Sequence, residues 1–170
     1  MRKIRLTDRL DYIQPQPYIV SSENYSDDFE TPVLTAGQTF LLGKTDDKVG
    51  IYQANKEKPI ILFDDFTTAS KWVDFPFKVK SSACKILVPK EGANLRYLYY
   101  GMQWLRFDAS QHKRYWISQY SSLELPDYSK EKEQSIVKDL DNCTSLISLM
   151  QNQLTQLDSL VKSRFMGVAA

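Results

Sequence analysis

The sequence has few of the residues on which metal sites, disulfide scaffolds and nucleotide-binding loops depend. Its 170 residues include one histidine, two cysteines and six glycines. A single histidine excludes a histidine-rich zinc site, and neither a Gly-x-Gly-x-x-Gly loop nor a Walker loop occurs. Cys84 and Cys143 lie far apart in unlike contexts, so we expect two reduced thiols rather than a disulfide.

Long apolar runs are also absent. No stretch approaches the roughly 20 apolar residues that span a bilayer. The start is basic but no apolar signal core follows it, so we expect a cytoplasmic protein with no membrane partner. Hydrophobic residues make up 42% of the chain and charged residues 25%, which is typical of a folded domain. A chain of 170 residues accommodates one such domain plus an appendage.

Catalytic motifs are missing as well. Asp64 and Asp65 resemble a metal-binding pair, but adjacent strand residues point to opposite faces, so we expect a turn or capping role. The sequence contains no Glu-x-Lys tripeptide of the restriction-nuclease type and no Asn-Pro-Pro-Tyr-type methyltransferase motif. Cys143 lies on a helical apolar stripe, which leaves a Cys–His pair with His112 without support. We interpret the chain as a non-enzyme with no metal and no cofactor.

Basic residues are concentrated in the middle of the chain. The net charge is +1, but residues 71–114 hold nine basic and three acidic residues, whereas the flanking segments are both acidic. Gathered on one face, this excess would attract a polyanion. A solvated surface decorated with lysines is the alternative.

The pattern predicts a mixed α+β fold that is rich in strands. The run at residues 59–63 is continuously apolar and predicts a strand that is buried on both faces. Shorter strands are expected at residues 18–20, 32–34, 40–42, 84–88, 115–117 and 123–125. Residues 77–80 alternate between apolar residues and lysines, which predicts a half-buried strand with both lysines in solvent. Asn94 is expected to cap a helix with Leu95, Leu98, Tyr99, Met102 and Leu105 on one face.

The last quarter of the chain predicts one long helix, with no glycine or proline between Ser129 and Gly167. Apolar residues recur in it at alternating spacings of four and three, which is the seam of a coiled coil. The seam comprises Ile136, Leu140, Cys143, Ile147, Met150, Leu154, Leu157 and Val161. We therefore expect a globular domain at residues 1–127, a long helix at 128–166 and a tail at 167–170.

Short polar segments follow the predicted strands and mix hydroxyl, lysine and aromatic side chains. Such groups bind phosphate and sugar oxygens, and basic side chains also reach guanine edges. Thr67, Thr68 and Ser70 could instead satisfy the backbone of their own loop. The candidate DNA contacts are Thr67, Thr68, Ser70, Lys71, Lys80, Ser81, Lys113, Arg114 and Tyr115, with Gln38 and Lys44 as weaker candidates.

Several of these segments carry a family resemblance. Residues 63–71 (FDDFTTASK) with 73–82 (VDFPFKVKSS) resemble the target recognition domain of type I restriction–modification specificity subunits. Residues 112–118 (HKRYWIS), followed by Leu125 and Pro126, resemble the stretch that closes such domains. Residues 131–165 are similar to the conserved long helix of the family.

The resemblance implies a non-catalytic DNA recognition subunit. Such a subunit would read one half of a bipartite target in double-stranded DNA and dock adenine methyltransferase subunits, and a restriction–translocase subunit would join the larger complex. Family members carry two recognition domains and two conserved helices, whereas this chain has one of each. In addition, Leu125-Pro126-Asp127-Tyr128 departs from the usual Leu-Pro-Pro-Leu, and residues 167–170 have no counterpart.

The unpaired seam predicts a homodimer through antiparallel long helices, with a recognition domain at each end. Within such a dimer we expect Arg114 to read guanine and the lysines to contact phosphates. Two alternatives stay open. The chain could be a regulatory protein that binds the methyltransferase without reading DNA, or a coiled-coil adaptor with a strand-rich head.

Overall fold

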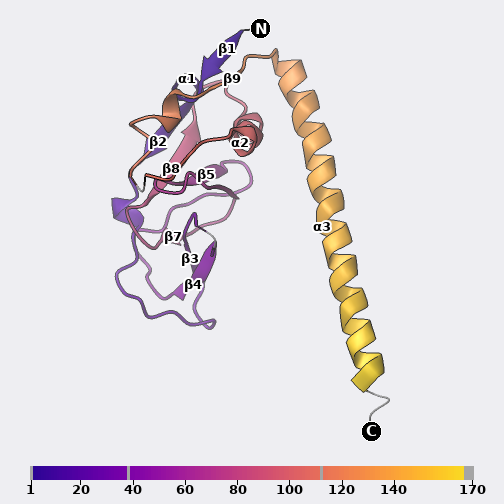
Figure 1. Cartoon of the computed structure of the whole chain (residues 1–170). Helices are drawn as coiled ribbons and strands as arrows, with labels where there is room; N and C mark the ends of the chain where they lie inside the picture. The colour runs from indigo at the N-terminus through magenta and orange to yellow at the C-terminus, as the bar shows by residue number, and fades with distance from the viewer. Residues whose placement is uncertain (1, 38, 112, 167–170) are drawn as a thin grey trace. The chain divides into compact units, whose positions relative to one another are not determined.

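The computed structural model describes residues 2–37, 39–111 and 113–166 of the chain. Gln38, His112 and the tail at 167–170 lie outside the described residues. The chain divides into two compact units, Met1–Tyr128 and Ser129–Ala170. The first unit is mixed α+β and rich in strands, and the second is one long helix, which confirms the predicted fold class (Figure 1).

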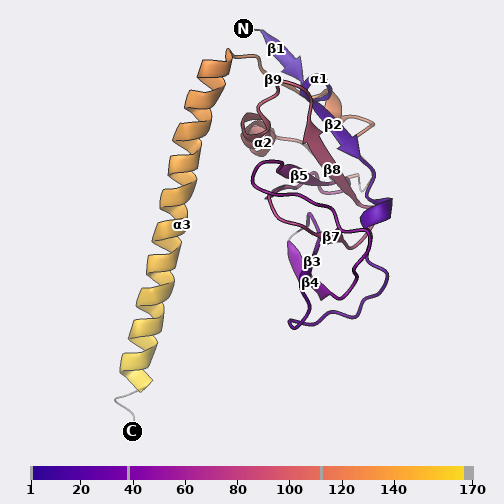
Figure 2. The same cartoon turned by 180° about the vertical axis from the view of Figure 1, so that it is seen from behind.

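The first unit contains three small sheets and one helix of ten residues. Its elements are β1 (Lys3–Arg5), α1 (Leu6–Arg9), β2 (Leu10–Ile13), β3 (Thr31–Leu34), β4 (Leu41–Thr45), β5 (Ile60–Asp64), β6 (Ser70–Val73), β7 (Lys78–Val79), β8 (Cys84–Pro89), α2 (Leu95–Trp104) and β9 (Glu124–Pro126), with short 3-10 turns at η1 (Gln16–Tyr18) and η2 (Tyr120–Ser122). Both views place the β4–β3–β7 sheet at the end of this unit opposite to the β1–β9 pair (Figures 1 and 2).

The central sheet has the order β2–β8–β5–β6, with each neighbouring pair antiparallel. The residues of β5 from Ile60 to Phe63 are all buried, which confirms the strand predicted from the apolar run. The two central strands supply Leu62 and Ile86 to a core that also contains Leu34, Val73 and Phe77. The antiparallel pairing of these strands fixes which residues at their ends lie side by side.

The second sheet has the order β4–β3–β7, with β3 antiparallel to β4 and parallel to β7. The strand β7 corrects the prediction for residues 77–80. Lys78 is buried, its Nζ lies 3.0 Å from the Asp47 carboxylate, and it donates to the Val49 carbonyl at 2.7 Å. The alternating pattern identified a strand, but it could not reveal a buried ion pair across 31 residues of sequence.

The two ends of the first unit lie side by side. Lys3 pairs with Pro126 and Arg5 with Glu124 in the antiparallel β1–β9 ladder. Asp127 then accepts from Arg2 at 2.9 Å and from Arg9 at 3.0 Å. The ladder and these ion pairs fasten the beginning of the unit to the segment that leads into the second unit.

The helix α2 begins as predicted, because the Asn94 side chain accepts from the Tyr97 N–H at 3.1 Å. A glycine inside a helix costs about 1 kcal/mol relative to alanine. Here Gly101 faces the side chain of Leu125 so closely that a Cβ would collide with it. The glycine therefore allows α2 to pack against β9.

Two predicted strands are absent from the described residues. Residues 18–20 form the end of η1 and a single bridge between Ile19 and Val79. Residues 115–117 belong to a turn instead of a strand, with Tyr115 and Trp116 buried. Tyr18 and Ile19 pack against the core and Tyr115 and Trp116 are buried, whereas Ile117 is exposed. Sequence alone does not separate such apolar turns from short strands.

The second unit is α3 (Lys130–Met166), a helix of 37 residues that agrees with the predicted start near Ser129. Much of its predicted seam is open to solvent, with Ile147, Met150 and Leu154 between 56% and 62% exposed. No helix in the part of the chain that the structure describes is long and apolar enough to cross a membrane.

Candidate nucleic-acid interface

Most of the predicted contact residues lie at one edge of the central sheet, where β5 ends and β6 and β8 begin. Asp64 at the end of β5 is paired with Cys84 at the start of β8, and Phe63 is paired with Ser70 at the start of β6. The loops 65–69 and 81–83 therefore leave the sheet at the same edge, and a turn at 113–118 is bound to it through Asp65. We call this edge, with its three segments 65–69, 81–83 and 113–118, the loop edge.

The first segment is built on Asp64. Its carboxylate accepts from the backbone N–H groups of Phe66 at 2.8 Å and Thr67 at 3.0 Å. The N–H of Thr68 returns to the Asp64 carbonyl at 2.9 Å. These bonds confirm the predicted turn role of Asp64.

Thr68 adopts a φ of 60°. Among the described residues it is the one non-glycine residue with a positive φ. A β-branched residue rarely occupies the left-handed region, because its Cβ crowds the backbone. The loop therefore stores local strain at a position that is partly exposed.

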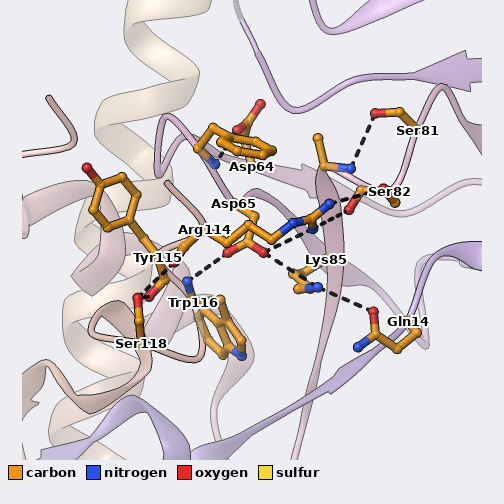
Figure 3. Close-up of polar contacts among 12 residues, drawn as sticks. Gln14, Asp64, Asp65, Ser81, Ser82, Lys85, Arg114, Tyr115, Trp116 and Ser118 are labelled. Atoms are coloured by element: carbon orange, nitrogen blue, oxygen red, sulfur yellow. Dashed lines mark hydrogen bonds and ion pairs between the residues drawn. The ribbon is translucent and has the colours of Figure 1, made fainter. Parts of the chain in front are cut away.

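Asp65 is the centre of the loop edge (Figure 3). Its side chain is 2% exposed and accepts from the Trp116 N–H at 2.7 Å. The same carboxylate lies 3.5 Å from Lys85 Nζ and 3.4 Å from Arg114 Nη1. Lys85 is itself buried on β8 and reaches Gln14 at 3.3 Å. A buried carboxylate needs such partners, and here they come from two separate segments, the strand β8 and the turn at 113–118.

Arg114 lies across the loop edge. Its Nη1 also donates to the Ser82 carbonyl at 2.8 Å, and its Nη2 donates to the Ser82 hydroxyl at 3.1 Å. The guanidinium lies 5.3 Å from the ring centre of Phe66. The side chain is nevertheless 48% exposed, so the loop edge presents positive charge to solvent.

An aromatic cluster packs the turn at 113–118 against the central sheet. Trp116 and Tyr120 lie 5.1 and 4.8 Å from the ring of Phe63 on β5, measured between ring centres. Phe107 contacts Tyr115 and Tyr120 at 5.1 and 5.3 Å. These contacts fix the turn that carries Lys113 and Arg114.

Two of the predicted DNA contacts have side chains that are buried in this structure. Ser70 is buried, and its hydroxyl accepts from the Gln103 amide at 2.7 Å. Tyr115 is 1% exposed, and its hydroxyl accepts from the Gln111 N–H at 2.9 Å. Both residues were predicted as contacts because they carry hydroxyl groups. Residue type does not reveal whether the side chain is buried, which depends on packing in the folded chain.

The other predicted contacts are at least partly exposed. The structure brings Thr67, Thr68, Lys71, Ser81, Lys113 and Arg114 to the loop edge or to the strand residue next to it. Lys80 follows β7 and binds the Glu23 carboxylate. Lys44 lies on β4 and donates to the Asp27 carbonyl at 3.2 Å.

Sequence reasoning missed the structural role of Asp65 and Lys85. One signal was available, since a lysine in the apolar strand Cys84–Pro89 must be buried with a partner or end the strand. It also missed Gly37, where a Cβ would lie 3.9 Å from the Asp64 carboxylate, so the turn after β3 comes close to the same edge. Within the described residues no group of histidine, cysteine and acidic side chains could hold a metal ion.

Comparison with known proteins identifies related chains. No family model matches. The chain is 44% identical over 154 residues to the specificity subunit of the type I restriction enzyme EcoR124I/EcoR124II from Escherichia coli, covering 84% of this chain and 38% of that protein.

Solved structures show the same fold. The crystal structure of a type I restriction–modification S subunit from M. genitalium matches with a TM-score of 0.62 and 17% identity, over 87% of this chain and 42% of that one. A chain from a study of assembly and conformational transition of the type I R-M system matches with a TM-score of 0.63 and 13% identity, over 95% and 42%. The chain thus spans less than half the length of these relatives.

Proposed function

Because the chain belongs to the family of type I restriction–modification specificity subunits, we propose that it recognises DNA sequence without catalysing a reaction. Residues 1–127 would read one half of a bipartite target, and residues 128–166 would form the dimerisation helix and part of the dock for an adenine methyltransferase. The observation that carries this proposal is the 44% identity to a specificity subunit over 154 residues.

The loop edge is the proposed DNA-binding surface. It supplies hydroxyl groups from Thr67, Thr68 and Ser81 and positive charge from Lys113, and Lys71 adds positive charge from the neighbouring strand β6. Lysines and hydroxyls contact phosphates, which position a protein on the duplex, while side chains that enter the major groove read bases. The basic middle of the chain supports this surface, because the excess of nine basic over three acidic residues at 71–114 would attract a polyanion.

The long helix is the proposed dimer interface. The apolar face that includes Ile147, Met150, Leu154, Leu157 and Val161 is more than half exposed at each of these residues. A contiguous apolar stripe of this kind marks an interaction surface. The proposed partner is a second copy of the chain.

An antiparallel pairing fits the spacing of the seam. When residue 136 of one helix faces residue 161 of the other, 140 faces 157, 143 faces 154 and 147 faces 150. All eight seam residues then meet another seam residue. A parallel pairing would instead place Arg164, the next position of the same spacing, against its own copy, and like charges repel.

Methylation mapping tests the proposed function. Cells that express the chain together with the methyltransferase of its own system should acquire adenine methylation in a symmetric sequence with an unread spacer. Two recognition domains related by a two-fold axis produce such symmetry. Adenine methylation in an asymmetric motif, or none above that of cells expressing the methyltransferase alone, would contradict the proposal.

The alternative is a protein that binds the methyltransferase or another protein and reads no DNA. A competition gel shift separates the two functions. Specific duplex should displace labelled DNA from the complex, whereas a non-reading regulator would reduce DNA binding by the methyltransferase whatever duplex competes.

A further inference from the structure

We propose that Asp65 and Arg114 are positioning residues that hold the three segments of the loop edge at fixed spacing, so that Arg114 acts within the protein instead of reading a base. The inference rests on the proposed DNA recognition and assigns a role to residues that do not themselves need to touch DNA.

Asp65 uses its backbone and its side chain to join these segments. Its N–H donates to the Ala83 carbonyl at 2.8 Å, and its carbonyl accepts from the Tyr115 N–H at 2.8 Å. Its carboxylate accepts from the Trp116 N–H at 2.7 Å. Asp65, which directly follows β5, thus binds both the loop before β8 and the turn at 113–118.

Arg114 completes the connection from the other side. Both terminal nitrogens of its guanidinium donate within the protein, to Asp65 and to two oxygens of Ser82. The planar fork that would engage guanine in a bidentate manner is therefore directed at Ser82. The guanidinium also lies over the ring of Phe66, which gives Arg114 a second contact with the segment 65–69.

The buried charges make this arrangement stiff. Asp65 and Lys85 are both buried, and truncation of one member of a buried pair leaves an uncompensated charge. The segments cannot separate without exposing or isolating these charges. Base reading requires contact atoms to be held within about 0.5 Å of their productive positions, which such a brace supplies.

The variant Arg114→Lys keeps the positive charge and removes the planar guanidinium. Its effects on base discrimination and on the salt slope distinguish three possible roles of Arg114. A base reader would lose discrimination at one base pair. A phosphate contact would keep discrimination, with a similar dependence on salt. A positioning residue would lose discrimination at every base pair of the half-site while the salt slope stays the same.

The experiment measures methylation by the complex with its methyltransferase on duplexes that carry the motif mapped for the wild type. A matched set carries each single base-pair substitution. For Arg114→Lys we expect discrimination to fall about tenfold across the half-site, because a charge-assisted hydrogen bond is lost. Ser82→Ala, which removes one acceptor and no charge, should produce a smaller loss with the same spread. Lys113→Ala is the comparison and should weaken binding to all duplexes about equally and reduce the salt slope, with discrimination between base pairs unchanged.

Amide hydrogen exchange on the free chain provides a second measurement. The amides of Asp65, Tyr115 and Trp116 should exchange about tenfold faster in Arg114→Lys, while the amides of β3 stay unchanged. Loss confined to one base pair, or unchanged exchange in these three amides, would overturn the positioning role. A wild-type chain that directs no methylation motif would overturn the proposed function with it.

Discussion

At the scale of single residues, Thr68 carries strain that other residues would relieve. A left-handed backbone costs an L-residue about 1–2 kcal/mol, and asparagine tolerates it better than a β-branched residue does. We expect Thr68→Asn, with its φ of 60° retained, to raise the free energy of unfolding by about 1 kcal/mol in urea titrations. If the hydroxyl contacts DNA, the same variant should bind its target more weakly.

Thr67→Asn is the matched control for this prediction. Thr67 is exposed in the same loop, and its φ is not positive. Its substitution should change the free energy of unfolding by less than about 0.5 kcal/mol. A destabilised Thr68→Asn would show that the Thr68 side chain holds the loop together, against our reading of the strain.

Lys71 tests the electrostatic part of the surface. It lies on β6 next to the loop edge, and a phosphate contact there should be independent of sequence. We expect Lys71→Ala to weaken binding to all duplexes about equally and to lower the slope of log K against log salt by roughly one unit. Filter binding or fluorescence anisotropy at several salt concentrations measures the slope.

Lys90→Ala is the comparison for Lys71→Ala. Lys90 follows the far end of β8, where it donates to the Thr7 carbonyl at 2.7 Å. Its loss should leave the salt slope unchanged. Equal slopes in all three proteins would remove Lys71 from the DNA footprint.

Asp47 gives the fold a dependence on acid pH. Hydrogen bonds from Ser21 and the charge of Lys78 lower the pKa of Asp47 from 3.8 to about 2. A lowered pKa in the folded state contributes stability above pH 3.8, and that contribution is lost as the pH falls toward 2. In urea unfolding between pH 5 and pH 2, the stability difference between wild type and Asp47→Asn should therefore shrink on acidification. A constant difference would contradict the assigned cause.

Residue type predicted where the candidate contacts lie in the sequence but not which of their side chains are buried. The residue types Thr, Lys and Arg were sufficient to find the loop edge, because they stand in short segments after apolar runs. The same reasoning placed Ser70 and Tyr115 in contact with DNA, although both are buried. Ser70 is covered by Gln103, which is 33 residues away in the sequence. Tyr115 packs against Phe107, and no sequence pattern links these two residues.

At the scale of elements, the strong local signals predicted structure, two short apolar segments did not form the predicted strands, and the pairing of strands was not predictable. The long helix, the Asn94 cap and the apolar strand β5 follow from patterns within single segments. By contrast, β7 pairs in parallel with β3, and its Lys78 finds Asp47 in another loop. Such contacts are set by which segments meet in the folded chain, and a single sequence carries no direct record of them.

Cys143 makes the orientation of the helices measurable. In the antiparallel pairing residue 143 faces 154, and the two Cys143 residues lie about 16 Å apart along the axis at 1.5 Å per residue. We expect mild oxidation to cross-link Leu154→Cys into a disulfide-bonded dimer and to leave the wild type uncross-linked. Cys84 should not interfere, because burial raises the pKa of its thiol to about 11.

A parallel pairing predicts that the wild type and Leu154→Cys both cross-link. The two Cys143 residues would then face each other, and the wild type would cross-link on oxidation within disulfide reach. The double variant Cys143→Ser, Leu154→Cys distinguishes the pairings again, since residue 154 meets its own copy in the parallel arrangement alone. Cross-linking of the wild type or of this double variant would exclude the antiparallel register.

At the scale of the whole molecule, the proposed recognition and the proposed dimerisation belong to different units. The first unit has its own core, and its ends are closed by the β1–β9 ladder, so it does not depend on the helix for its sheets. The helix unit has instead a long exposed apolar face. A change in the seam should therefore separate the two copies while each recognition domain stays folded.

Leu154→Glu tests this separation, because it places a charge in the apolar interface. We expect the wild type to sediment as a dimer at micromolar concentration and Leu154→Glu to sediment as a monomer. Asn152→Glu adds the same charge on the opposite side of the helix and should remain a dimer. Thermal unfolding of the first unit should be alike in all three proteins.

The methylation pattern then connects the dimer to its function. A monomer holds one recognition domain, so Leu154→Glu should lose methylation of the two-part motif, whereas Asn152→Glu should retain it. In the proposed dimer the helices join two domains so that they recognise two half-sites at a fixed spacing, and dissociation would remove the second contact. If Leu154→Glu were monomeric and still methylated the full motif, the methyltransferase subunits themselves would hold the two domains together, and the helix pairing would not be needed for recognition.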